Sequence, residues 1–429
     1  MRILCIIVAN FAVLLTLNAT ELPQQDEKVH LGVASCAASM CHGSVIPRDG
    51  SDVLQNEYII WSRADAHSQA FQTLLSPESA EIANKLGLEN AASAGVCLDC
   101  HSDNVKTEQQ GEKFQLSDGV GCESCHGGAE EYIRSHTHAA ISRDENISNG
   151  LFPTDKPKAR AKLCLSCHLG NKNKQATHDI MGAGHPRLAF ELDTFGILQP
   201  LHYVVDEDYL KQKWSGDNYV TWVYGQLEAS RATLTLLEEK LIDNSSIFPE
   251  LSLFDCHSCH HNMSDLKWNE NKGQGFKPGT VRLNDGNFKM LMIIAASTVD
   301  SDKLHQHLAD IRKALNDKSK LKITITGILE DIDFIETSLV QQNLVQKKVS
   351  ATSTLNNILQ EGAKGAFSDY IAAEQVVMAI DLLFEFIDEK ATFAADISLL
   401  FDIVADDEKF DDALFSKQLK KINDRWVKQ

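Results

Sequence analysis

The sequence lacks an excess of basic residues. Its 429 residues include 60 Asp and Glu against 41 Lys and Arg, for a formal net charge of −19 at pH 7. A surface of that sign repels the phosphates of nucleic acids and the headgroups of anionic lipids. The composition therefore argues against nucleic acid and membrane surfaces as partners. It predicts protein partners that are basic or that dock through a local basic patch.

Long apolar runs are also lacking after residue 19. A membrane-spanning helix needs about 20 consecutive apolar residues, and no later segment provides them. The first residues differ, because Arg2 precedes an apolar run over 3–17, and Leu17-Asn18-Ala19 is typical of a signal-peptidase site. We therefore expect residues 1–19 to be a signal peptide cleaved near Ala19, and the mature chain to be periplasmic without a membrane span. An uncleaved membrane anchor is the alternative.

Cysteine is absent after residue 259, and the cysteines before that position follow a fixed spacing. Removal of Cys5 with the signal peptide leaves ten cysteines of the 11 in the chain. In an exported protein an even number of cysteines first suggests disulfides. However, four C-x-x-C-H motifs and one wider C-x4-C-H motif use each of the ten once.

This pattern is the attachment signature of haem c, in which two thiols bond to the porphyrin and the adjacent histidine binds the iron. A zinc site would need tetrahedral groupings of the cysteine pairs and would give no reason for a histidine after each pair. We therefore predict five covalently bound haem c groups. The attachment residues would be Cys36, Cys41, Cys97, Cys100, Cys122, Cys125, Cys164, Cys167, Cys256 and Cys259, and the proximal iron ligands His42, His101, His126, His168 and His260.

The second axial ligand of each iron is expected to be histidine, because methionine is scarce. The chain has seven methionines including Met1, against 16 histidines. Met40, Met181 and Met263 lie close to haem segments and stay open as alternatives. Histidine ligation at both positions favours a low reduction potential. The predicted distal ligands are His67, His136, His178, His185 and His202, with His30, His138 and His261 in reserve.

Several of these segments resemble a known family. The run Cys36-Ala-Ala-Ser-Met-Cys41-His42-Gly43, the later Asp65-Ala-His67, Gly119-Val-Gly-Cys122 and Ala183-Gly-His185-Pro-Arg are similar to exported multihaem c-type cytochromes. That family is related to the tetrahaem electron acceptor of hydroxylamine oxidoreductase. The resemblance covers residues 30 to 262 and implies bis-histidine haems in close-packed pairs. It supports His67, His136, His185 and His202 as distal ligands, whereas tetrahaem members would lack the fifth motif at Cys256.

The organisation of the chain predicts a mainly α fold in two parts. Residues 20–270 are expected to form a loop-rich pentahaem cytochrome c core with few strands, because the segments between the motifs are polar and loop-like. Within it, residues 219–242 read as a long amphipathic helix. After a breaker-rich linker, residues 285–429 show helical apolar spacing and no cysteine, which predicts a haem-free helical domain. That domain serves either for packing or for docking and oligomerisation.

The combined features predict an electron-transfer protein that carries electrons between redox partners through bis-histidine haems. The expected partners are other cytochromes or a quinol-linked membrane complex. The alternative is a multihaem oxidoreductase that acts on a small nitrogen or sulfur compound at one five-coordinate haem. A scaffold that recruits a membrane complex through its helical tail is a third possibility. The motifs do not separate these options, because all five end in the ordinary histidine.

Overall fold

The computed structural model describes residues 21–48, 53–213, 217–243, 249–260, 282–296, 301–315 and 317–428. The protein is mainly α-helical, as the sequence predicts, and in these residues β-structure is limited to two isolated bridges. The expected signal peptide, residues 1–19, lies outside the described ranges. Within those ranges no helix is long and apolar enough to cross a membrane.

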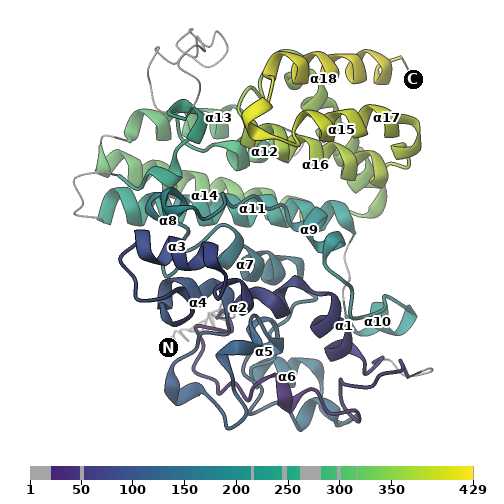
Figure 1. The fold of residues 1–429 in the computed structure, drawn as a ribbon. Helices are drawn as coiled ribbons and strands as arrows, with labels where there is room; N and C mark the ends of the chain where they lie inside the picture. Colours follow the sequence, from purple (N-terminus) through teal and green to yellow (C-terminus); the bar gives the residue numbers. More distant parts are fainter. Residues whose placement is uncertain are drawn as a thin grey trace, which may run out of the picture.

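The N-terminal part consists of short helices joined by loops and lies in the lower half of Figure 1. Side-chain caps define several helix starts. For example, Ser76 accepts a hydrogen bond from the Ser79 amide, and Pro77 occupies the first turn of its helix. The helices are α1 (Glu57–Ala64), α2 (Ala70–Thr73), α3 (Pro77–Lys85), α4 (Gly95–His101), α5 (Cys122–His126), α6 (Arg143–Ser148), α7 (Pro157–His168), α8 (His178–Ala183), α9 (Leu192–Leu198) and α10 (Glu207–Gln212).

The C-terminal part is built from longer helices and lies in the upper half of Figure 1. A capping box at Asn343 and Gln346 starts one of them. These helices are α11 (Asn218–Leu237), α12 (Gly286–Ala295), α13 (Ser301–Ala314), α14 (Lys318–Val340), α15 (Leu344–Ala363), α16 (Tyr370–Phe386), α17 (Lys390–Ile403) and α18 (Asp412–Trp426).

Helix α11 joins the two parts. Asp217 caps its first turn, and a π-helical turn over Glu238–Asp243 extends it to the length that the sequence predicts. It is buried on most sides rather than on one face, because α7 and α9 contact it from below while α12, α14 and α16 contact it from above. Its buried residues are mostly apolar, and the buried polar side chains of Gln226 and Glu228 bond to Gln375 and Arg231. The predicted linker, residues 271–280, lies outside the described ranges.

The apolar core is distributed unevenly between the two parts. One large cluster of buried residues runs from Tyr219 on α11 to Ile422 on α18. The N-terminal part has two small clusters, one around Leu74 and Leu98 and one around Leu165 and Leu192. A region with so little apolar core of its own needs another source of burial, and prosthetic groups are the source that the sequence predicts.

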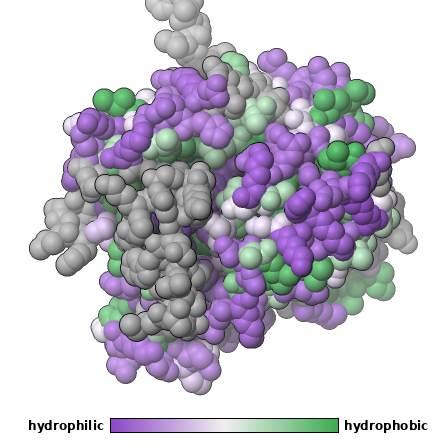
Figure 2. All heavy atoms as spheres, turned by 90° about the horizontal axis from the view of Figure 1, so that it is seen from above, coloured by the Kyte–Doolittle hydropathy of each residue, from purple (hydrophilic) through white to green (hydrophobic). Residues whose placement is uncertain are grey.

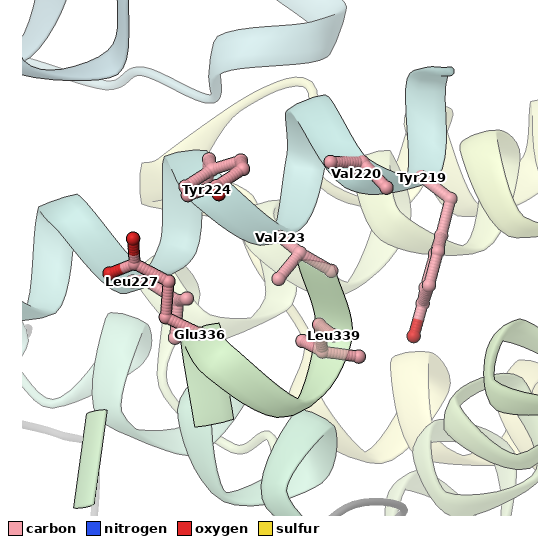
Figure 3. A pocket seen from close by; sticks show the side chains of 7 residues that line it. All are labelled: Tyr219, Val220, Val223, Tyr224, Leu227, Glu336 and Leu339. Carbon is pink, nitrogen blue, oxygen red and sulfur yellow. The ribbon is translucent and has the colours of Figure 1, made fainter. Parts of the chain in front are cut away.

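Ion pairs strengthen the contact between α7, α11 and α14. The Arg231 guanidinium bonds to Glu228, to Asp333 and, at 2.9 Å, to Glu336, and the Lys158 ammonium lies 2.8 Å from both Glu336 oxygens. Glu336 also borders a small pocket between α11 and α14 (Figure 3). The pocket lining contains neither histidine nor cysteine, so this cavity is no place for a haem. Its lining residues are Tyr219, Val220, Val223, Tyr224, Leu227, Glu336 and Leu339.

The helices of the upper part turn their polar sides outward. Figure 2 looks down on this face, where hydrophilic side chains form broad areas and apolar ones form smaller separate patches. Helix α18 illustrates the pattern, because Phe415, Leu419 and Ile422 are buried while Lys420 and Asp424 are exposed. Such an arrangement is typical of an amphipathic surface helix.

Candidate haem-binding sites

The five cysteine motifs lie at the ends of short helices or in turns. The second, third and fourth motifs form the last turns of α4, α5 and α7, and the histidine of each motif is the last residue of its helix. The first motif, 36–42, follows a 3₁₀ helix at Val33–Ser35, and the fifth lies around the 3₁₀ helix Cys256–Ser258. In a helix, cysteines three residues apart lie on one face, so both thiols can reach the same group.

Each histidine of a motif lies opposite one of the predicted distal histidines. The structure thus brings all ten predicted iron ligands together in five pairs. Numbered by the order of their motifs, the pairs and the separations of their ring centroids are site 1, His42 with His136 (6.2 Å); site 2, His101 with His185 (6.2 Å); site 3, His126 with His202 (6.1 Å); site 4, His168 with His67 (6.1 Å); and site 5, His260 with His178 (6.2 Å).

These separations fit a metal ion between the two rings. Two metal–nitrogen bonds of about 2 Å each, plus about 1 Å from each nitrogen to its ring centre, give roughly 6 Å. Rings in mutual contact would vary with their orientation, and other aromatic pairs of this protein range from 4.3 Å for Phe384 with Phe393 to 6.4 Å for His168 with Phe195. The five histidine pairs keep 6.1–6.2 Å although their interplanar angles run from 14° to 90°.

The ring nitrogens provide a second test of the fit. A histidine that binds a metal through Nε2 donates its Nδ1–H to a neighbouring acceptor. Five of the ten paired histidines have such a bond, and in each case the atom is Nδ1. The acceptors are Glu57 Oε2 for His42 (2.9 Å), Asp65 Oδ1 for His67 (2.8 Å), and the carbonyl oxygens of Ala70 for His101 (3.0 Å), Tyr132 for His136 (3.0 Å) and Pro186 for His185 (2.7 Å).

Short helices position the distal histidines. His67 lies in a 3₁₀ turn, Ala66–Gln69, that Asp65 caps, and His136 lies in another over Ser135–Thr137. Helix α8 supports two sites, because His178 is its first residue and His185 follows its C-cap, Gly184. Gly184 has φ of +125°, a conformation that residues with a side chain rarely adopt. His202 lies in the chain between α9 and α10.

Thiols of different motifs lie close together. The Cys36 and Cys122 thiols are close enough to shift each other's pKa, and so are the Cys100 and Cys167 thiols. Sites 1 and 3 therefore adjoin, as do sites 2 and 4. Cys125 of site 3 lies in the electrostatic field of the two cysteines of site 4, and burial is the main cause of its raised pKa. Site 5 is linked to site 2 through the two ends of α8.

Burial favours the uncharged form of three of these histidines, because it lowers the pKa of His126, His168 and His202. Desolvation, together with the neighbouring His202 and His42, lowers the pKa of His126 to about 3. The neutral imidazole is the form that binds a metal ion. At neutral pH the His126 ring is therefore ready to act as a ligand without losing a proton.

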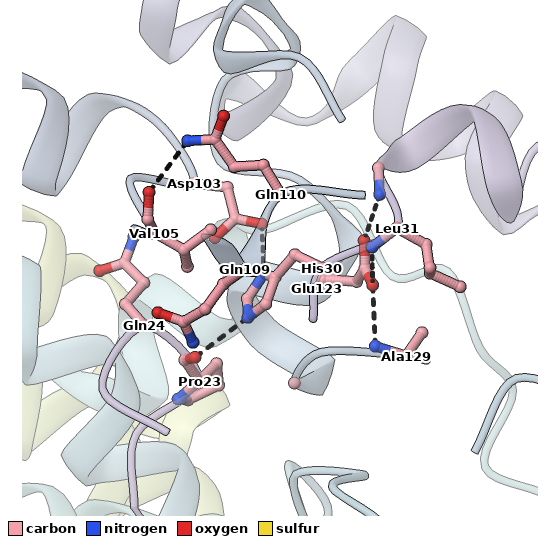
Figure 4. A network of polar contacts seen from close by, with 12 residues as sticks. Pro23, Gln24, His30, Leu31, Asp103, Val105, Gln109, Gln110, Glu123 and Ala129 are labelled. Atoms are coloured by element: carbon pink, nitrogen blue, oxygen red, sulfur yellow. Dashed lines mark hydrogen bonds and ion pairs between the residues drawn. The ribbon is translucent and has the colours of Figure 1, made fainter. Parts of the chain in front are cut away.

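The two reserve ligands within the described residues, His30 and His138, do not join a pair. His30 is fully buried, and both its ring nitrogens have partners, Asp103 Oδ2 at 2.7 Å and the Pro23 carbonyl oxygen at 3.1 Å (Figure 4). Burial is the largest single influence and lowers the pKa of His30, but the bond and charge of Asp103, the charge of Glu123 and the Pro23 bond together raise the pKa above its usual value. His138 Nδ1 accepts the Ala140 amide.

The methionine alternatives do not lie opposite a motif histidine in any of the five pairs. Met40 is 79 % exposed and Met181 is a half-buried residue of α8. Met263 lies outside the described residues, as does the reserve ligand His261. The five histidine pairs leave no motif histidine for a methionine to complement.

Sequence reasoning missed the carboxylates that support the sites. Glu123, inside the third motif, is 2 % exposed and accepts the amides of Leu31, Gly32 and Ala129 (Figure 4), which fastens this motif to the N-terminal segment. Glu57 and Asp65 bond to paired histidines as described above. The Asp65-Ala-His67 spacing was a usable signal, because a carboxylate two residues before a histidine can cap the same turn.

Comparison with known proteins adds one match. Residues 35–127 match the family model described as cytochrome c554 and c-prime. The matched segment includes the first three motifs and His67. No curated protein and no solved structure matched the chain. The family match supports a multihaem c-type cytochrome, with covalently bound haem c and a role in electron transfer among redox partners.

Proposed function

We propose that the protein is a periplasmic electron carrier with five haem c groups, each bound between two histidines. The observation that carries this proposal is the set of five histidine pairs with nearly equal centroid separations, each pairing one motif histidine with one distal histidine. An iron held by two protein ligands has no open position for a substrate. The arrangement therefore favours electron transfer over chemistry on a small molecule.

Each proposed site uses four residues of the chain. Two cysteines attach the group covalently, the motif histidine binds one face of the iron, and the distal histidine binds the other. A bis-histidine haem supplies a reversible one-electron couple of low potential. The protein keeps the ligating rings in place through the Nδ1 bonds described above, which also decide the tautomer.

The contacts between motifs suggest the order in which electrons pass. Cys36 adjoins Cys122, Cys125 lies near the fourth motif, Cys167 adjoins Cys100, and α8 links the second site to the fifth. The proposed series is therefore site 1, site 3, site 4, site 2 and site 5. This order differs from the order of the motifs in the sequence. One end of the series belongs to the N-terminal segment and the other lies beside the helical part, where His257 contacts Tyr370 of α16.

The cellular setting and the domain roles are also proposals. The predicted N-terminal signal and the family match favour export, with other cytochromes or a quinol-linked membrane complex as donor and acceptor. A relation to the tetrahaem electron acceptor of hydroxylamine oxidoreductase is part of this proposal. Residues 20–270 would bear the haems, and residues 285–429 would pack against them through α11. The net charge of −19 favours basic surfaces on the partners.

The test combines haem counting with a reductive titration. Mass spectrometry of the mature protein is expected to show five attached haems, in line with the five motifs. Stepwise reduction in the absence of oxygen should then consume five electrons per chain, and carbon monoxide should leave the spectrum of the reduced protein unchanged. Stoichiometric carbon monoxide binding would instead identify an open iron position and support the oxidoreductase alternative.

A further inference from the structure

We propose that helix α1 positions two carboxylates, Glu57 and Asp65, which lower the reduction potentials of sites 1 and 4 more than those of the other sites. The proposal rests on the proposed function and deepens it, because it assigns a potential-tuning role to residues that bind no iron. Glu57 is the first residue of α1 and Asp65 is its C-cap. The helix spans eight residues, or about 12 Å at 1.5 Å per residue. It thus holds one carboxylate against each of two sites.

Asp65 is buried and has a partner for each oxygen. Oδ1 accepts the Nδ1–H of His67 at 2.8 Å and the backbone amide of the same residue at 3.0 Å. Oδ2 accepts the side-chain amide of Gln199 at 2.9 Å. The residue is 5 % exposed, so water does not screen its charge effectively. Gln199 precedes His202 of site 3 by three residues, so Asp65 also ties the segments of sites 3 and 4 together.

Glu57 has the same relation to site 1. Its Oε2 accepts the Nδ1–H of His42 at 2.9 Å, and its Oε1 accepts the Gln55 amide at 3.1 Å. The Glu57 side chain is 17 % exposed. Both carboxylates therefore have one oxygen on a histidine Nδ1 and another on an amide that holds the side chain in this orientation.

Site 2 provides the internal contrast. The Nδ1 atoms of His101 and His185 bond to neutral acceptors, the carbonyls of Ala70 and Pro186 and the Thr73 hydroxyl. A carboxylate accepts the imidazole proton more strongly than a carbonyl does, which makes the ring a more electron-rich ligand. Its negative charge also opposes the gain of an electron at the site. Reduction adds one electron and no proton, so the carboxylate favours the oxidised state.

The expected consequence is an uneven profile of potentials along the proposed series. The carboxylate contribution lowers sites 1 and 4 relative to site 2, whose histidines bond to neutral acceptors. By this contribution alone, the step from site 4 to site 2 is downhill for an electron, whereas the step from site 3 to site 4 is uphill. Glu57 and Asp65 are thus positioning residues that shape this profile.

The test is a pair of isosteric variants that control for each other. D65N and E57Q keep the shape and most hydrogen bonds but remove the charge. Potentiometric titration followed by visible and EPR spectra is expected to show the largest shift to a more positive potential at site 4 in D65N and at site 1 in E57Q. A smaller shift is expected at site 3, whose His202 lies in the field of both carboxylates, and none at sites 2 and 5. EPR distinguishes the site 1 couple, whose rings are nearly parallel at 14°, from that of site 4, whose rings are nearly perpendicular at 89°, as are those of sites 2 and 3.

The outcomes separate this inference from the proposed function. If both variants retain the full haem content and neither moves a couple, or if all couples move equally, the tuning role is wrong while the electron-carrier proposal stands. If the wild-type protein itself lacks five low-spin haems, the proposed function fails first. Should D65N fail to mature with its haems, E57Q alone decides the matter, because Glu57 is more exposed and holds no segment of a second site.

Discussion

Deletion of one distal histidine should open one iron position per chain. In His136→Ala, site 1 loses the ring that lies 6.2 Å from His42, while Cys36, Cys41 and His42 remain to attach the haem. The variant is therefore expected to retain all its haems, with one of the five changing from low-spin to high-spin. Because the structure has five histidine pairs, the high-spin fraction should be one-fifth of the total iron.

The assay is carbon monoxide binding to the reduced protein, measured as moles bound per mole of chain. The account predicts one for His136→Ala and none for the wild type. His138→Ala is the matched control, because His138 lies two residues away on the same exposed segment and its Nδ1 accepts only the Ala140 amide. Equal binding by both variants, or no binding by His136→Ala, would refute the assignment of His136 as a ligand.

Two further predictions concern stability. Gly127→Ala should lower the free energy of unfolding by about 2–4 kcal/mol for two reasons. The residue has a positive φ of +82°, and its new Cβ would lie 2.1 Å from the Gly150 carbonyl oxygen. Gly87→Ala, with φ +70° and nothing within 4 Å of the added Cβ, should cost about 1 kcal/mol, and denaturant unfolding compares the two. Burial, aided by Glu191, raises the pKa of Asp193 to about 7. The pKa of an unfolded Asp is about 3.9, so between about pH 4 and 7 the native state holds a proton on Asp193 that the unfolded state has lost. The free energy of unfolding therefore falls as pH rises through this range. Asp193→Asn should remove this loss, worth at most about 4 kcal/mol, so its melting temperature should exceed that of the wild type at pH 8 and match it near pH 4. An equal difference at both pH values would contradict this reasoning.

The chemistry of the sites could be predicted from local spacing. A C-x-x-C-H motif places its two thiols and its imidazole within about one helical turn. The motif can therefore be recognised from five consecutive residues. The mainly α fold followed from the same kind of local pattern. The helix expected over 219–242 is present, but its nearly complete burial was not expected, because it depends on helices from both parts of the chain that pack around α11.

The pairing of the histidines could not be predicted in the same way. His136 lies ten residues after His126 in the sequence, yet the structure pairs it with His42 and places His202 opposite His126. Likewise His178 and His185 flank one short helix but belong to different pairs. Such pairs join distant segments, and only the packed chain brings those segments together. The roles of Glu57 and Asp65 depend on the same long-range geometry.

The most direct test of the central claim is low-temperature EPR of the purified ferric protein, with haem and iron quantified on the same sample. The account predicts five low-spin irons per chain and no high-spin component, since five histidine pairs would fill every axial position. A high-spin signal near one iron per chain would contradict it and would favour a five-coordinate catalytic haem. Fewer than five haems would contradict the attachment at Cys36 and Cys41 first, because only that motif departs from the usual spacing.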